Sequence, residues 1–321
     1  MESNQGVPSR ALADMPLGPK LRACLGIDAG SYRGHALPAD EYEHLRPEFS
    51  KNLTERLVAE DFSKRTDLLV DVMDELVAMD MPDVVTSVYR AHSTLLPAGD
   101  FRALLAIAVA AMLSGDYDTA VAKFAEAQVV NPREPAPYVN IGKILLHRGN
   151  SAEAEAWIES GLVAQPNYAP MWELAAAHDQ DVHGLDGAAE RIRARAVSLD
   201  SWSGVSLAAD LASPPDNARK AAWLSEFESH DSDLDYLVEY TGALGQAGDF
   251  AKIPTLVWRA EREAGKSLPW QLRVHCAQAH MAMNDDAGWE RQMAAVLKDS
   301  ATPTSVKEGL KALHAEARAS H

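Results

Sequence analysis

A repeat with a period of 34 residues is the feature of this sequence that most restricts its fold. Gly115 and Gly149 are one such period apart, and three further pairs share the offset: Ala120 with Ala154, Phe124 with Ile158, and Pro132 with Pro166. A Gly flanked by Asp or Asn favours a turn, a small residue lets two helices approach closely, and Pro ends a helix. Each copy therefore predicts two antiparallel helices joined by a tight turn.

Apolar residues at spacings of three and four extend this pattern on both sides of the repeat. They predict a helix over about 62–77 and a second one that begins at Pro82, since Pro suits a first helical turn. Further helices follow, separated by turns near 213–216, 248–253 and 284–286, and a last helix covers about 303–318. Residues 1–47 hold five of the 19 glycines and five of the 17 prolines without such spacing, which predicts irregular structure.

Residues 101–200 resemble the tetratricopeptide-repeat family, whose motif has the form W-x2-L-G-x2-Y, then A-x3-F, then P. The second copy fits this motif with Tyr138, Ile141, Gly142, Leu145, Ala154, Ile158 and Pro166. The first copy fits it with Leu104, Ile107, Ala108, Ala111, Ala120, Phe124 and Pro132. A third copy begins near Ala169, but it lacks the closing Pro and has Asp179 where an apolar ring belongs. The resemblance implies an all-α fold in which antiparallel helical hairpins stack as a right-handed α-solenoid.

The repeat boundaries suggest a division of the chain into five parts. These are an irregular or partly disordered segment (1–48), a helical hairpin (49–100), three repeats (101–134, 135–168 and the degenerate 169–202), degenerate hairpins (203–301) and a C-terminal capping helix (302–321).

Composition and charge exclude several classes of function. Hydrophobic residues make up 47% and charged residues 24%, as in ordinary folded proteins. A formal net charge of -17 without a long basic stripe disfavours nucleic-acid binding. The longest apolar run, Ala103 to Leu113, has 11 residues, about half the roughly 20 that a membrane span needs. The first 20 residues lack the apolar core of a secretory signal, so we expect a cytoplasmic protein without membrane insertion.

Three motifs suggest chemistry, and each has a simpler interpretation. The string LGIDAGS (25–31) resembles a phosphate loop of actin-like ATPases, but the alternating strands and helices of that fold are missing. His178, Asp179, Asp181 and His183 allow a metal site, although a solvated turn in the third repeat is favoured. Asp231, Asp233 and Asp235 begin like a calcium loop, but Tyr236 replaces its Gly, so a helix cap is expected.

No nucleophile, metalloprotease, P-loop or dinucleotide motif occurs, and Cys24 and Cys276 are far apart without a CxxC spacing. We therefore expect no enzymatic activity, no cofactor, no metal and two reduced thiols.

The resemblance places a partner on a concave surface lined by the first helix of each repeat. At those positions the two better copies have Leu105, Val109, Met112, Val139, Asn140, Lys143, Leu146 and His147, with Arg102 and Leu113 beside them. Family members that bind the carboxylate end of heat-shock proteins use Lys and Asn, and two of those places hold Leu105 and Val109 here. We therefore expect an apolar peptide or amphipathic helix as ligand, although some of these side chains can instead pack on residues 82–96.

Three hypotheses follow from the sequence. The first is a non-catalytic scaffold or adaptor that binds one protein partner. Whether the chain also forms a homo-oligomer is left open by the sequence. The second is a chaperone for secreted or aggregation-prone clients, which the apolar surface and acidic charge also suit. The third is an enzyme with an unrecognised site in the N-terminal region.

Overall fold

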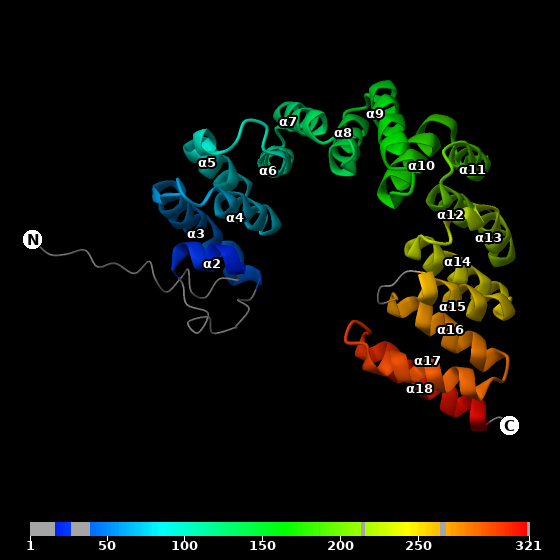
Figure 1. The fold of residues 1–321 in the computed structure, drawn as a ribbon. Coiled ribbons are helices and arrows are strands. Elements are labelled where there is room, and N and C mark those ends of the chain that lie inside the picture. Colours follow the sequence, from blue (N-terminus) through cyan, green and yellow to red (C-terminus); the bar gives the residue numbers. More distant parts are fainter. Residues whose placement is uncertain (1–16, 27–38, 186, 213–215, 264–267, 320–321) are drawn as a thin grey trace, which may run out of the picture. The chain divides into compact units, whose positions relative to one another are not determined.

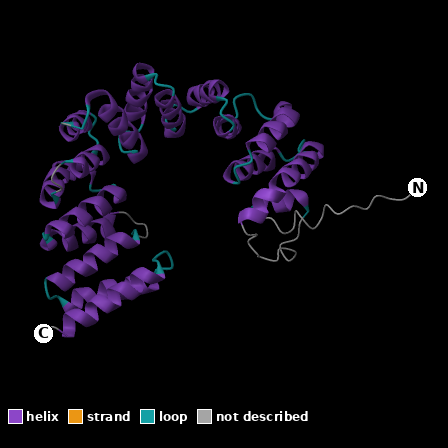
Figure 2. Cartoon of the chain, turned by 180° about the vertical axis from the view of Figure 1, so that it is seen from behind, coloured by secondary structure: helices purple, strands orange, loops and turns teal. Residues whose placement is uncertain are grey.

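A computed structural model describes residues 17–26, 39–185, 187–212, 216–263 and 268–319 of the chain. Every regular element in these ranges is a helix, and none is a strand (Figure 2). The all-α fold class expected from the sequence is therefore confirmed. The chain divides into two compact units, residues 1–164 and residues 165–321.

Unit 1 consists of helices, most of which contact the next helix in the chain (Figure 1). They are α2 (Pro19–Leu25), α3 (Ala39–Ala59), α4 (Thr66–Ala78), α5 (Pro82–His92), η2 (Ser93–Leu95), α6 (Phe101–Leu113), α7 (Tyr117–Val130), α8 (Pro135–His147) and α9 (Ser151–Ala164). Leucines and valines of α2 to α5 form one apolar cluster, which α6 covers with Ala103, Ala106 and Ala110. The repeat begins where this cluster ends.

The 34-residue repeat forms two hairpins, α6 with α7 and α8 with α9. Ala120 and Ala154 are completely buried in them, as expected for small residues at a close helix crossing. Tyr138 donates a hydrogen bond through its hydroxyl to the carbonyl of Pro132 at 2.9 Å. In unit 2, 34 positions later, Trp172 Nε1 donates to the carbonyl of Pro166 at 2.6 Å. The first aromatic residue of a repeat thus fixes the end of the repeat before it.

Six of the described turns between helices share one backbone geometry. One or two residues after the helix a residue has a positive φ, and the next N–H donates to a carbonyl five residues back at 2.9–3.0 Å, as Asp116 does to Ala111. The positive φ falls on Asp80, Gly115, Gly149, Asp200, Gly248 and Asn284. Gly, Asp and Asn are the residues that adopt this conformation most readily, so the turn signal read in the repeat recurs where Gly is absent.

Unit 2 continues with paired helices. They are α10 (Ala169–His183), α11 (Ala188–Ser198), α12 (Trp202–Leu211), α13 (Asn217–Leu224), η3 (Ser225–His230), α14 (Leu234–Ala247), η4 (Phe250–Lys252), α15 (Ile253–Glu263), α16 (Trp270–Ala282), α17 (Asp286–Lys298) and α18 (Thr304–Ala319). Each of α10, α12 and α14 contacts the next member of the series, which ends at α16, so these first helices form one layer. On α18, Leu310 is buried against α16 and α17 and Leu313 is exposed, as expected of a terminal helix.

The expectation of irregular structure over 1–48 is wrong in two places. Residues 19–25 form α2, and α3 already begins at residue 39. Apolar spacing does not predict these two helices. The seven residues of α2 are too few to show a periodic pattern, and α3 contains Pro47, which normally indicates a helix break. Tertiary contacts stabilise α2: the backbone N–H of Leu21 donates to the Glu75 carboxylate on α4 at 2.7 Å. In the string LGIDAGS, Leu25 ends α2, and residues 27–31 lie outside the described residues.

Candidate functional site

The partner-binding residues predicted on α6 form the first part of a surface strip. Leu105, Val109 and Met112 are half-buried, and their inner atoms pack on the cluster that contains Phe124 and Ile141. Arg102, one turn before them, is tied to α4 through an ion pair with Asp71 at 2.7 Å and a second one with Asp74. Leu113 at the end of the helix is exposed. Apolar surface therefore follows one face of α6.

The residues predicted on α8 differ in exposure. Leu146 is half-buried and packs on the same cluster as the three residues of α6, whereas Lys143 and His147 are exposed. The side-chain amide of Asn140 donates to the carbonyl of Ala136 at 2.9 Å. Val139 is only 6% exposed, so it packs inside unit 1 instead of lying on the surface. We call Leu105, Val109, Met112 and Leu146 together the apolar strip.

His178, Asp179, Asp181 and His183 do not lie in a turn, because α10 continues to His183. The expectation of a solvated turn is therefore wrong. His178 and Asp179 are buried, and Asp179 accepts two hydrogen bonds from Arg191 Nε on α11, at 2.9 and 3.0 Å. This ion pair makes a carboxylate tolerable where the family motif has an apolar ring. Among the described residues, no three His, Cys, Asp or Glu side chains are placed to hold a metal ion.

Of the three aspartates predicted to cap a helix, Asp233 caps α14, Asp235 lies in the first turn of α14, and Asp231 pairs with Arg259 instead. Asp233 Oδ1 accepts from the backbone N–H of Asp235 at 3.0 Å and of Tyr236 at 3.3 Å. Its second oxygen accepts from Trp202 Nε1 at 3.0 Å, which ties α14 to α12. The two cysteines are buried free thiols, and burial raises the pKa of Cys276 to about 12. That thiol is thus far from the reactive thiolate form.

Unit 2 also contains a cleft that the sequence did not reveal. It has a volume of about 440 Å³ and lies between the first helices α10, α12 and α14. Its lining consists of Asn167, Ala169, Trp172, Glu173, Trp202, Ser203, Ser206, Leu207, Asp210, Asp235 and Glu239. Four of these side chains are carboxylates, and we call this site the acidic cleft.

One internal lysine neutralises part of the acidic cleft. Lys220 of α13 binds Asp210 at 2.8 Å and Glu239 at 2.7 Å, and Ser206 Oγ also donates to Glu239 at 2.5 Å. Burial alone raises the pKa of Glu239, but hydrogen bonds from Lys220 and Ser206 outweigh burial and leave that pKa below its ordinary value. Glu239 is therefore an anion at neutral pH.

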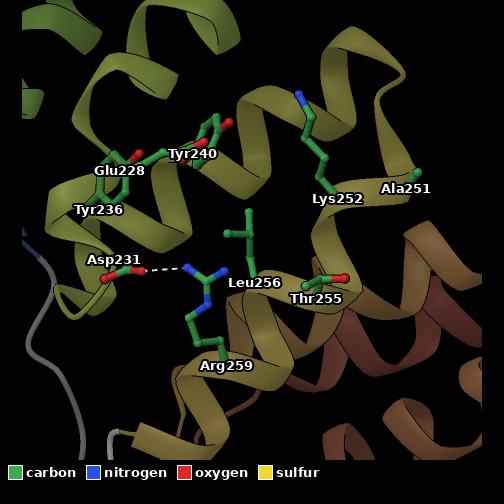
Figure 3. Close-up of a pocket in the computed structure, with 9 residues that line it drawn as sticks. All are labelled: Glu228, Asp231, Tyr236, Tyr240, Ala251, Lys252, Thr255, Leu256 and Arg259. Carbon is green, nitrogen blue, oxygen red and sulfur yellow. Dashed lines mark hydrogen bonds and ion pairs between the residues drawn. The ribbon is translucent and has the colours of Figure 1, made fainter.

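A smaller pocket of about 310 Å³ lies between α14 and α15 (Figure 3). Glu228 and Asp231 line one part of it, and Lys252 and Arg259 line another. Arg259 Nη1 binds Asp231 at 2.7 Å, and Figure 3 shows the Arg259 side chain extending from α15 toward Asp231. Its acidic and basic side chains are equal in number, so this pocket lacks the one-sided charge of the acidic cleft.

No sequence motif pointed to the acidic cleft. Its carboxylates and Lys220 come from separate helices, and only the packing of α10, α12, α13 and α14 brings them together. A feature available in the sequence was the low share of basic residues, 30 Lys and Arg against 47 Asp and Glu. That imbalance predicts unpaired carboxylates, but it does not say where they gather.

Packed helical hairpins whose turns repeat the same backbone geometry define the chain as an α-helical repeat protein. A tetratricopeptide-repeat family model matches residues 111–177, which run from the end of α6 into α10. Residues 111–177 thus match the tetratricopeptide-repeat family, whose fold is in general a scaffold for interactions between proteins.

Two solved structures resemble the chain with low sequence identity. One is a tetratricopeptide repeat protein from Parabacteroides merdae, with 12% identity over 92% of this chain and 98% of that one, at a TM-score of 0.34. The other is PilW, a type IV pilus biogenesis factor, with 13% identity over 76% of this chain and 97% of that one, at a TM-score of 0.33. Scores this low add nothing to the family match. No curated protein matches the sequence.

In the parts of the chain that the structure describes, no helix is both long and apolar enough to span a membrane.

Proposed function

We propose that the chain is a non-catalytic scaffold that binds an apolar peptide or an amphipathic helix of a partner protein on the apolar strip. The observation that carries this proposal is the exposure of Leu105, Val109, Met112 and Leu146. These four side chains rest on one cluster yet remain partly open to solvent. An amphipathic helix presents apolar side chains at spacings of three and four, which complements a strip of this kind.

Exposed groups at the edge of the strip add polar contacts for the partner. Lys143 and His147 lie on α8 beside Leu146, and both are exposed. His147 rests against the Tyr117 ring of α7, with ring centroids 5.4 Å apart. A partner segment with a carboxylate next to its apolar face would form an ion pair with Lys143. That ion pair would fix the orientation in which the segment binds to the apolar strip.

A paired substitution tests the proposal. Val109→Glu places a charge in the strip, and Val129→Glu makes the same change on α7 at a valine that is 77% exposed. The unmodified chain and both variants serve as bait for proteins in a lysate of the source cells, which mass spectrometry then identifies and quantifies. We expect Val109→Glu to lose the stoichiometric partner and Val129→Glu to retain it, with a smaller loss for Lys143→Glu.

Melting curves separate binding from folding in this experiment. An exposed substitution such as Val129→Glu should change the free energy of unfolding by no more than about 0.5 kcal/mol. Full capture by a folded Val109→Glu protein contradicts the proposal. Capture of many unrelated unfolded clients, instead of one stoichiometric partner, would favour a chaperone that uses the same strip.

A further inference from the structure

The acidic cleft of unit 2 has more anionic than cationic groups. Lys220 is shared by Asp210 and Glu239, at 2.8 and 2.7 Å respectively. Glu173 and Asp235 also line the cleft, and neither forms an ion pair within the described residues. Both are exposed, so a ligand that enters the cleft meets two open carboxylates beside the two that Lys220 holds.

Ser203 provides a second and independent indication of a ligand. It lines the cleft and is only 5% exposed, yet its hydroxyl has no hydrogen-bond partner in the described part of the chain. A serine within a helix commonly bonds a carbonyl of the preceding turn, but the Ser203 hydroxyl is unpaired without being fully enclosed, so it opens onto the cleft. The backbone N–H of Ser203 is already used, since it donates to Asn167 Oδ1 at 3.4 Å. The free hydroxyl thus offers a hydrogen bond to a group from outside.

We propose that the acidic cleft binds a lysine or arginine side chain of an extended partner segment. Lys220 shows that two carboxylates of the cleft, Asp210 and Glu239, bind an ammonium group at ordinary ion-pair distances. The half-buried Leu207 gives the aliphatic stem of a second basic side chain an apolar surface, while one of the two open carboxylates, Glu173 on α10 or Asp235 on α14, binds its charged end. The Ser203 hydroxyl and the Asn167 amide then bind the backbone of the segment.

A partner segment fits the cleft better than a metal ion. Among the described residues, no three His, Cys, Asp or Glu side chains are close enough to hold a metal ion together. A flexible side chain with a charged end instead suits carboxylates that are spread along a cleft of about 440 Å³. The net charge of -17 also raises the local concentration of basic partners at low ionic strength.

This inference rests on the proposed function only in that the ligand belongs to a partner protein. The site itself is different, because the acidic cleft lies in unit 2 and the apolar strip lies in unit 1. Binding at the cleft is therefore measured directly and without a lysate.

Two blocked heptapeptides test the proposal on the full-length, ¹⁵N-labelled chain. The first has the sequence Leu-Ala-Ser-Lys-Ser-Ala-Leu with acetylated and amidated ends, and the second has norleucine in place of Lys. The indole N–H of Trp202 reports on the cleft and is assigned from its loss in Trp202→Phe. We expect the lysine peptide to shift this resonance in a saturable way and the norleucine peptide to bind at least tenfold more weakly.

Charge-matched variants separate the cleft from general attraction. Glu173→Gln with Asp235→Asn should weaken the lysine peptide at least tenfold. Glu153→Gln with Glu155→Gln, two exposed residues of α9, changes the net charge equally and should leave the dissociation constant within twofold. Equal weakening by both pairs, or equal binding of the two peptides, overturns the proposal. If the Glu173→Gln, Asp235→Asn double variant melts at a lower temperature than the unmodified chain, Glu173→Gln alone replaces it. The expected result is then a threefold weaker binding of the lysine peptide. Val109→Glu should bind the lysine peptide normally, so failure here is distinguishable from failure of the apolar strip.

Discussion

Gly204→Ala should destabilise unit 2, although Gly→Ala at an exposed position within a helix is normally stabilising. Gly204 lies in α12, where an added Cβ would be 2.5 Å from Trp172 Cε2 and 2.6 Å from the Cβ of Ala196. Carbon atoms in normal contact are about 3.5–4.0 Å apart, so α10 or α11 must move away from α12 by about 1 Å. Trp172 cannot simply rotate, because it is fully buried and its Nε1 is bound to the carbonyl of Pro166.

The size of the effect follows from two opposing contributions. Overpacking a well-packed site costs about 1–3 kcal/mol, and the upper part of that range applies because two rigid neighbours are hit at once. Replacing Gly by Ala in a helix returns about 1 kcal/mol. The free energy of unfolding should therefore fall by about 1–2 kcal/mol, which lowers the melting temperature by about 2–8 °C for a unit of this size.

Thermal and urea melts followed by far-ultraviolet circular dichroism measure this change. Gly309→Ala in α18 is the matched control, because nothing lies within 4 Å of its added Cβ. The control should gain up to about 1 kcal/mol. If Gly204→Ala gains as much as Gly309→Ala, then α10, α11 and α12 are not packed as described, and the floor of the acidic cleft changes with them.

Three further predictions concern the core and the pH dependence of stability. Ala154→Leu inserts a large side chain at a fully buried helix crossing and should cost about 1–3 kcal/mol in a urea melt, so an unchanged midpoint would contradict the repeat register. Arg191→Met leaves the buried Asp179 carboxylate without its ion-pair partner and should lower the free energy of unfolding by about 3 kcal/mol. Adding Asp179→Leu should recover part of that loss, and a double variant as unstable as Arg191→Met would contradict this account. Burial lowers the pKa of His275 below its ordinary value of 6.5, with Glu239 of α14 opposing the shift, so the native state favours the neutral ring. The resulting stability is complete above about pH 6.5 and declines as the pH falls toward the native pKa, and His275→Asn should flatten this decline in melts at a series of pH values.

The sequence by itself determined the helical hairpins and their turns. Apolar spacing of three and four is a local property, and it survives in the structure because each helix buries one face against its neighbour. The turns are also local, since a residue with positive φ favours Gly, Asp or Asn whatever surrounds it, as Gly149 and Asn284 illustrate. The family resemblance follows from the same two signals, and so do the capping role of Asp233 and the burial of Ala154.

Only the tertiary structure decided which polar side chains are buried and which gather in a site. Asp179 looked like a turn residue because nothing near it in the sequence shows that Arg191 of the next helix neutralises it. Val139 was expected on the surface because its place in the repeat does not reveal what the neighbouring helices cover. The acidic cleft depends on Glu173, Asp210 and Glu239, which come from three different helices. Coulomb energy depends on distances in space, and the packing of helices sets those distances for residues that lie far apart along the chain.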